Sequence, residues 1–162
     1  MNTDQLIKFC SDVRRALESA NAERIHDEQI SLGMSEFPTG CCGDTTCLLA
    51  YLIFNQFGEI ALHRSGIYMA SIKSDARLRD NNSHAWLELS GTVIDLTADQ
   101  FNDRGFNNPA VMVTQDKTFH SLFSSRDKRD NPEFATTPTL APRMTKSLWY
   151  VQDKLRSDGW SL

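Results

Sequence analysis

The stretch CGDTTCLLAYLIFNQF, residues 42–57, decides how this chain folds. Drawn as a helix, it carries apolar side chains in nearly every direction, which is typical of a helix buried on most sides. Gly58 follows directly, and glycine is the residue type that most often ends a helix. Asp44 falls in the first turn, where the positive end of the helix dipole stabilises a carboxylate. The sequence therefore predicts a central, buried helix over residues 42–57.

Composition limits the class of protein to which the chain can belong. With 162 residues, 40% hydrophobic and 23% charged, it is long enough for one domain with a sizeable core, and we assign residues 1–162 to that domain. The net charge is −4, and no stripe of lysine and arginine is present. Nucleic acid is therefore not an expected partner.

The same sequence predicts a cytoplasmic protein that does not enter a membrane. The first residues lack an apolar run after a basic start, and the longest apolar stretch is too short to span a bilayer. Export by a route without a cleavable signal is the alternative. Cys41 and Cys42 are adjacent and Cys47 follows five residues later, a spacing that disfavours disulfides and fits a reducing compartment.

Hydrophobic periodicity and turn residues predict the other elements. Helical spacing of apolar residues marks both ends of the chain, and short β-rich runs occupy the middle. The fold class that we expect is α+β, with helices on one side of a small, mostly antiparallel sheet. The predicted elements are helices over 3–21 and 148–155, strands over 67–72, 83–89, 92–96 and 111–113, a helical turn from 97, and loops over 21–38 and 124–143.

The predicted hairpin of residues 83–96 brings a histidine and an aspartate together. If Ser90 and Gly91 form a two-residue loop, Leu89 pairs with Thr92 and side chains alternate between the faces from there. His84 and Asp95 then share one face as diagonal neighbours, about 7–8 Å apart at the backbone. That separation is within reach of a hydrogen bond between imidazole and carboxylate.

Cys42 stands at the start of the predicted buried helix, where free N–H groups and the helix dipole lower the pKa of a thiol. Gly40 and Gly43 flank it and allow a substrate to approach the backbone closely. Residue types alone leave Cys41 as an alternative nucleophile or a substrate contact. Trp86 is predicted on the same face of the hairpin as His84, where its ring would line the site or stack on a substrate.

Three segments of this chain, in this order, resemble the transglutaminase-like branch of the papain-like cysteine enzymes. They are GCCGD at residues 40–44, HAWLE at 84–88 and VIDLT at 93–97. The resemblance covers about residues 37–101 and implies a papain-like fold. It also implies roles for three residues, with Cys42 as the nucleophile, His84 as the base and Asp95 as the carboxylate that orients the base.

The expected activity is that of a cysteine-dependent hydrolase or acyltransferase acting on an amide through a thioester. Peptide cleavage, deamidation of glutamine and transamidation share that intermediate. The expected substrate is a protein or peptide, and the chemistry requires no metal and no organic cofactor. The oligomeric state and the identity of the substrate do not follow from the sequence.

Two alternatives stay open at this point. The first is a catalytically silent module that keeps the fold and binds a protein partner. The second, which we rate lower, is a zinc site formed by Cys41, Cys42, Cys47 and His84, whose spacing lacks the usual pair of cysteines two residues apart. His26, His63 and His120 have no companions in the sequence, so they are predicted to be surface or loop residues.

Overall fold

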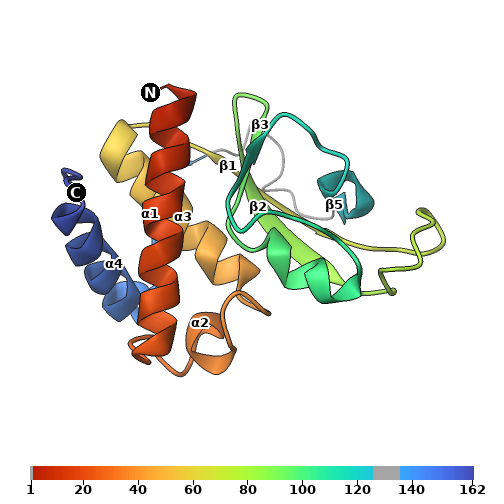
Figure 1. Cartoon of the computed structure of the whole chain (residues 1–162), viewed down its shortest axis with the longest axis horizontal. Coiled ribbons are helices and arrows are strands. Elements are labelled where there is room, and N and C mark those ends of the chain that lie inside the picture. Colours follow the sequence, from red (N-terminus) through yellow and green to blue (C-terminus); the bar gives the residue numbers. More distant parts are fainter. Residues whose placement is uncertain (1, 126–135) are drawn as a thin grey trace.

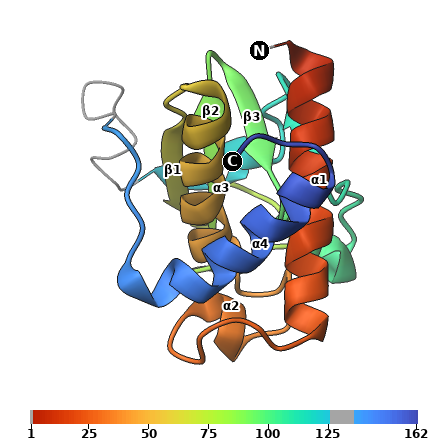
Figure 2. The same cartoon turned by 90° about the vertical axis from the view of Figure 1, so that its left-hand side faces the viewer.

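The computed structural model describes residues 2–125 and 136–162 and has two layers. Helices form one layer and a sheet with its connecting loops forms the other (Figure 1). Turned by 90°, the helical layer faces the viewer, with α4 crossing in front of α1 and α3 (Figure 2). In chain order the elements are α1 (Thr3–Ala22), α2 (Ser31–Met34), α3 (Cys42–Phe57), β1 (Leu62–Ile67), β2 (Ser83–Leu89), β3 (Thr92–Asp95), η1 (Ala98–Arg104), β4 (Met112–Thr114), η2 (His120–Leu122), β5 (Ser124–Ser125), η5 (Pro142–Met144) and α4 (Thr145–Ser157).

The sheet has the strand order β4-β3-β2-β1-β5, and each neighbouring pair is antiparallel. An antiparallel sheet with helices gathered on one side is an α+β fold, so the predicted α+β class is confirmed. The hairpin register is also confirmed, because Leu89 pairs with Thr92 and Leu87 with Ile94. Side chains therefore alternate along β2 and β3 as the two-residue loop requires.

The helices are close to their predicted bounds. Asn2 caps α1 by accepting a hydrogen bond from the backbone N–H of Gln5, and Gly58 ends α3 in the left-handed conformation at φ +70°. The C-terminal helix is longer than predicted, and the short α2 lies inside a predicted loop. No helix in the described part of the chain is long and apolar enough to cross a membrane.

The prediction of a strand over residues 67–72 is wrong. The strand lies earlier, at β1. The apolar residues after it form a turn, in which the N–H groups of Ile72 and Lys73 donate to the carbonyl of Met69. The hydroxyl of Tyr68 contacts the carbonyls of Lys73 and Asp75, and it accepts the N–H of Asp75. β1 contains Gly66, where an added Cβ would lie 2.9 Å from the backbone of Phe123. A glycine there lets the chain cross close enough for β5 to pair with β1.

The predicted loop over 124–143 is correct only in part. Its first two residues form β5 and its last ones enter η5, and residues 126–135 lie outside the described part of the chain. The predicted helical turn after β3 is present as η1, although the side chain of Thr97 makes no capping hydrogen bond to it.

Two clusters of buried side chains pack on opposite faces of the sheet. The aliphatic core lies between the sheet and the helices, and Leu87 and Ile94 are its sheet members. The aromatic core lies on the other face, which carries Trp86 and Val93. The aliphatic core includes Leu6, Val13, Leu17, Leu48, Leu49, Leu52, Ile53, Leu87, Ile94 and Leu155, and the aromatic core consists of Tyr68, Leu78, Trp86, Val93, Ala98, Phe101, Phe119 and Phe123.

Candidate active site

His84 and Asp95 meet on the aromatic face of the hairpin. Nε2 of His84 lies 2.6 Å from Oδ2 of Asp95, and both side chains are almost fully buried. The even-numbered hairpin loop produces this contact, because it places both residues on the same face of adjacent strands. The predicted contact between the two residues is confirmed.

A second imidazole, that of His120, reaches the same carboxylate oxygen. Its Nε2 lies 2.8 Å from Oδ2 of Asp95, and the residue is 3% exposed. The prediction of a surface or loop position for His120 is therefore wrong. The sequence carries no sign of this contact, because His120 arrives from η2, 25 residues after Asp95, and no strand register places it. His26 does lie in a loop, as predicted, but its ring is buried and its Nδ1 lies 2.7 Å from the hydroxyl of Ser147.

Both oxygens of Asp95 are occupied. Oδ1 accepts the backbone N–H and the hydroxyl of Thr97, and Oδ2 faces the two imidazoles. Burial opposes the charge, but the positive charge on His84 and the hydrogen bonds from His120 and His84 outweigh it and hold the pKa of Asp95 well below its usual range. An ionised carboxylate only accepts, so each imidazole donates the proton of its Nε2 to it.

Cys42 is the first residue of α3 and is only partly buried. Burial opposes ionisation of its thiol, but hydrogen bonds with the ring of His84 and with the backbone of Ala85 outweigh this, and the pKa of Cys42 is lowered. Since Nε2 of His84 is bonded to Asp95, the ring nitrogen left for the thiol is Nδ1. Cys42 therefore lies close enough to His84 for the imidazole to lower the pKa of its thiol, and His84 itself is bonded to Asp95.

Cys41 differs sharply from its neighbour. It is completely buried, and its Sγ points to the carbonyls of Thr39 and Ser31, at 3.4 and 3.5 Å. Burial, and then the nearby charge of Asp44, raise the pKa of the Cys41 thiol to about 12. Such a thiol is neither nucleophilic at neutral pH nor exposed to a substrate, so Cys42 is the candidate nucleophile of the pair.

The pKa of His84 moves in the opposite direction to that of Cys42. Burial alone would lower it, but the charge of Asp95, the hydrogen bond to Asp95 and the contact with Cys42 raise it to about 9. A lowered thiol pKa beside a raised imidazole pKa favours a thiolate–imidazolium pair at neutral pH. The site can therefore hold a nucleophile and a proton donor at the same time.

Aromatic rings surround the His84 imidazole. Trp86 lies nearly parallel to it, with ring centroids 5.8 Å apart, and Phe101, Phe119 and Phe123 pack against it at 5.2 to 5.8 Å. Trp86 is 8% exposed, so its surface serves mainly to hold the ring of His84 in place. These contacts restrict the imidazole to the orientation that faces both Asp95 and Cys42.

Gln100 joins the two segments that carry the site. Its Oε1 accepts the N–H of Gly40, and its Nε2 donates to the carbonyl of Thr97 and lies 3.5 Å from Nδ1 of His84. Gly40 itself has φ +70°. Gly43 is exposed, and an added Cβ would meet no atom within 4 Å, so the space in front of the helix start is open.

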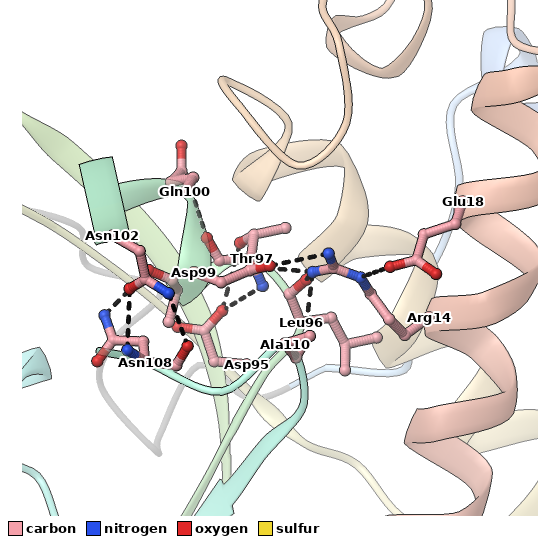
Figure 3. A network of polar contacts seen from close by, with 11 residues as sticks. Arg14, Glu18, Asp95, Leu96, Thr97, Asp99, Gln100, Asn102, Asn108 and Ala110 are labelled. Atoms are coloured by element: carbon pink, nitrogen blue, oxygen red, sulfur yellow. Dashed lines mark hydrogen bonds and ion pairs between the residues drawn. The ribbon is translucent and has the colours of Figure 1, made fainter. Parts of the chain in front are cut away.

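Arg14 fastens the segment after β3 to the helical layer (Figure 3). From α1 its guanidinium donates to the carbonyl of Leu96 at 2.6 Å and makes two hydrogen bonds of 2.9 Å to the carboxylate of Asp99. It also pairs with Glu18 and is only 7% exposed. This buried arginine fixes the position of the chain directly after Asp95 relative to α1.

A metal ion is a weaker explanation of the buried polar group. The ligand atoms of His84, Asp95 and His120 lie within 4.8 Å of one another, and among the described residues they form the one such group. Ligand atoms around a tetrahedral zinc ion stand about 3.3 Å apart, since each lies about 2.0–2.1 Å from the metal. Separations of 2.6 and 2.8 Å fit hydrogen bonds instead. The cysteine-rich zinc site considered from the sequence is not assembled in this part of the chain.

Comparisons with known proteins found no matching family model, no matching curated protein and no matching solved structure. The interpretation of the site depends on the geometry of this chain.

Proposed function

We propose that this protein is a cysteine-dependent hydrolase or acyltransferase that acts on an amide through a thioester. Cys42 is the nucleophile, His84 is the proton carrier and Asp95 is the carboxylate that orients His84. The single observation that carries the proposal is the contact of the His84 ring with a carboxylate on one side and a thiol of lowered pKa on the other. Such an arrangement is what nucleophilic catalysis by cysteine needs.

The reaction follows from these positions. The Cys42 thiolate attacks the carbonyl carbon of the amide and forms a tetrahedral intermediate. The C–N bond then breaks, the nitrogen leaves with the proton from Nδ1 of His84, and a thioester to Cys42 remains. Water, losing a proton to His84, hydrolyses the thioester, or an amine takes its place and gives a new amide.

The start of α3 supports charge stabilisation during attack. The first N–H groups of a helix have no acceptor within the helix, and Cys42 is the first residue of this one. Its own N–H can therefore donate to the oxygen of the tetrahedral intermediate. The open space at Gly43 supports access of a carbonyl group to the same point.

The fold and the substrate class belong to the same proposal. A buried helix that begins with the nucleophile, next to an antiparallel hairpin that carries the base and the carboxylate, supports the transglutaminase-like, papain-like fold. The substrate that we propose is a protein or peptide, either at a peptide bond or at a glutamine side chain. Four free cysteines support a reducing, cytoplasmic environment.

The experiment that tests the proposal is mass spectrometry of the protein after incubation with a peptide library and, separately, with an activity-based probe that labels reactive thiols. We expect a covalent adduct on Cys42 with the probe. Among the peptides we expect one of three changes: about +1 Da for deamidation, about −17 Da for crosslinking, or fragments for cleavage.

Cys42→Ala is the negative variant, and Cys47→Ala is its matched control on the same helix. Loss of the adduct in Cys42→Ala alone supports the proposal. An adduct that forms equally well on Cys47, or none on any cysteine of the folded protein, would favour a binding module without catalysis.

A further inference from the structure

His120 is a buried imidazole that the proposed reaction does not use directly. It lies at the start of η2, and its ring packs against Trp86 with centroids 4.9 Å apart. Its Nε2 donates to Oδ2 of Asp95 at 2.8 Å, the same oxygen that His84 uses. A buried imidazole fixed on the carboxylate of a catalytic group can change what that carboxylate does.

The two imidazoles on Asp95 are not equivalent. Nε2 of His84 is bonded to Asp95, so Nδ1 is the nitrogen left to interact with the thiol of Cys42, and a proton there has a partner. Nδ1 of His120 is buried and has no hydrogen-bond partner in the described part of the chain. A second proton on His120 would leave a buried N–H unpaired, which costs more than leaving a lone pair unpaired on a neutral ring. The geometry therefore directs the mobile proton to His84.

We propose that His120 is a positioning residue that, through its hydrogen bond to Oδ2 of Asp95, fixes the carboxylate and limits how strongly it holds the proton on His84. A carboxylate that already accepts an N–H from His120 and two donors from Thr97 has less charge to offer a fourth donor, the N–H of His84. His84 then gives up its proton more readily to the leaving nitrogen. Without His120, the carboxylate would hold the His84 imidazolium too firmly.

The titratable groups around this pair of imidazoles come from several elements. Cys42 faces His84 from α3, and Asp95 faces both rings from β3. Asp116, exposed in the loop before η2, has its pKa lowered mainly by hydrogen bonds from Thr118. Because Asp116 is exposed, its charge is screened by solvent, and Asp95 is the carboxylate that dominates the pKa of His84.

The test is an NMR titration of the protein carrying ¹⁵N-labelled histidine, which follows the pH at which the His84 ring loses its proton. In His120→Leu we expect this midpoint to move to higher pH by about 0.5–1 unit, because Asp95 loses a competing donor. His120→Gln keeps an amide N–H close to the position of Nε2, and we expect its midpoint to stay close to that of the natural protein. Ser121→Ala, exposed and next in the chain, is the matched control and should leave the midpoint unchanged.

A merely structural role would lower the free energy of unfolding in both His120 variants without moving the midpoint. An unchanged midpoint in folded His120→Leu, or an equal shift in His120→Gln, would overturn the proposal. If His120→Leu does not fold, the histidine spectrum of the natural protein tests the proposal instead, because it shows which ring nitrogen of His120 carries the proton. We expect the His120 proton on Nε2, and a proton on Nδ1 instead would contradict the assigned role.

The role assigned to His120 rests on the proposed function, so the same samples are also treated with iodoacetamide. If Cys42 is selectively alkylated and the midpoint does not move, the role of His120 fails and the function stands. If Cys42 is inert, the proposed function fails, whatever the titration of His84 shows.

Discussion

The two faces of the sheet are built from different side chains and do different things. On the helical face, the aliphatic core consists of apolar groups around α3, and it contains none of the three proposed catalytic residues. On the other face, the aromatic core encloses a histidine, an aspartate and a second histidine, all nearly inaccessible to solvent. Burial stabilises the first face directly, whereas on the second face it is tolerated only because each charge has a partner.

α3 connects the two faces. Its side chains, such as Leu48 and Leu52, fill the aliphatic core, while its first residue reaches the imidazole on the aromatic side. The proposed nucleophile, Cys42, is thus the first residue of a helix whose other side chains are packed in the aliphatic core. Changes on the aromatic face should act mainly on chemistry, and changes on the aliphatic face mainly on stability.

The largest effect is expected for Asp95→Asn. The substitution keeps the volume but removes the charge that both imidazoles share, so His84 loses its orientation and its raised pKa. We expect acyl transfer by Cys42 to fall about 10³-fold or more. Rates measured with the thiol probe check this, with far-UV circular dichroism to show that the variant is folded. A folded variant that keeps the full rate would contradict the assignment of the chemistry to the aromatic face.

A stability effect without a chemical one is expected for Leu52→Ala. This side chain is fully buried in the aliphatic core, and its truncation should cost about 2–5 kcal/mol of the free energy of unfolding. The rate of Cys42 alkylation per folded molecule should stay within about twofold, because α3 still begins at the same residue. Urea denaturation measures the free energy of unfolding, and timed alkylation measures the rate at Cys42. A large loss of rate would mean that the faces are coupled more tightly than their packing suggests.

A smaller effect on both faces is expected for Arg14→Lys. The lysine keeps the charge but cannot reproduce the paired bonds to Asp99 together with the bond to the carbonyl of Leu96. We expect a loss of about 1–3 kcal/mol in stability. The rate at Cys42 should also fall by a few-fold, because the chain after Asp95 is less firmly held. Glu18→Gln, which removes only the exposed partner of Arg14, is the control and should change neither quantity measurably.

The pH dependence of stability should include two contributions from the aromatic face. The pKa of His84 is raised from 6.5 to about 9, so its stabilisation is complete below about pH 6.5 and is lost as the pH rises through about 9. The pKa of Asp95 is lowered from 3.8, so its contribution is present above that value and disappears as the pH falls below it. Urea denaturation from pH 3 to 10 measures the loss of stability at alkaline pH and the beginning of the loss at acid pH. The loss of stability at alkaline pH should be smaller in His84→Ala and should persist in Leu52→Ala, because the buried thiols of Cys10 and Cys41 still contribute to it.

The sequence was most informative where structure is local. The apolar run of residues 42–57 and the Ser90–Gly91 turn each determine an element through neighbouring residues, and so the contact of His84 with Asp95 could be predicted. β1 was missed because its sequence, LHRSG followed by isoleucine, is mostly polar and contains a glycine that serves a close backbone crossing.

The missing parts of the site come from segments whose positions depend on long-range packing. His120 reaches Asp95 only because the chain returns over the aromatic face after β4, and Gln100 reaches Gly40 only because η1 folds back toward α3. Neither approach leaves a periodic pattern in the sequence. The separation of Cys41 from Cys42 is likewise set by the helix start, which turns one thiol inward and the other toward His84.

The most direct measurement of the central statement, that Cys42 and His84 form a thiolate–imidazolium pair, is the pH dependence of alkylation at each cysteine, read by peptide mass spectrometry. We predict that iodoacetamide labels Cys42 with a midpoint below pH 9.0, the ordinary value of a thiol, and that Cys41 and the buried Cys10 stay unlabelled at neutral pH. In His84→Ala the midpoint of Cys42 should rise. A Cys42 midpoint of 9 or above in the natural protein, unchanged by His84→Ala, would contradict the account.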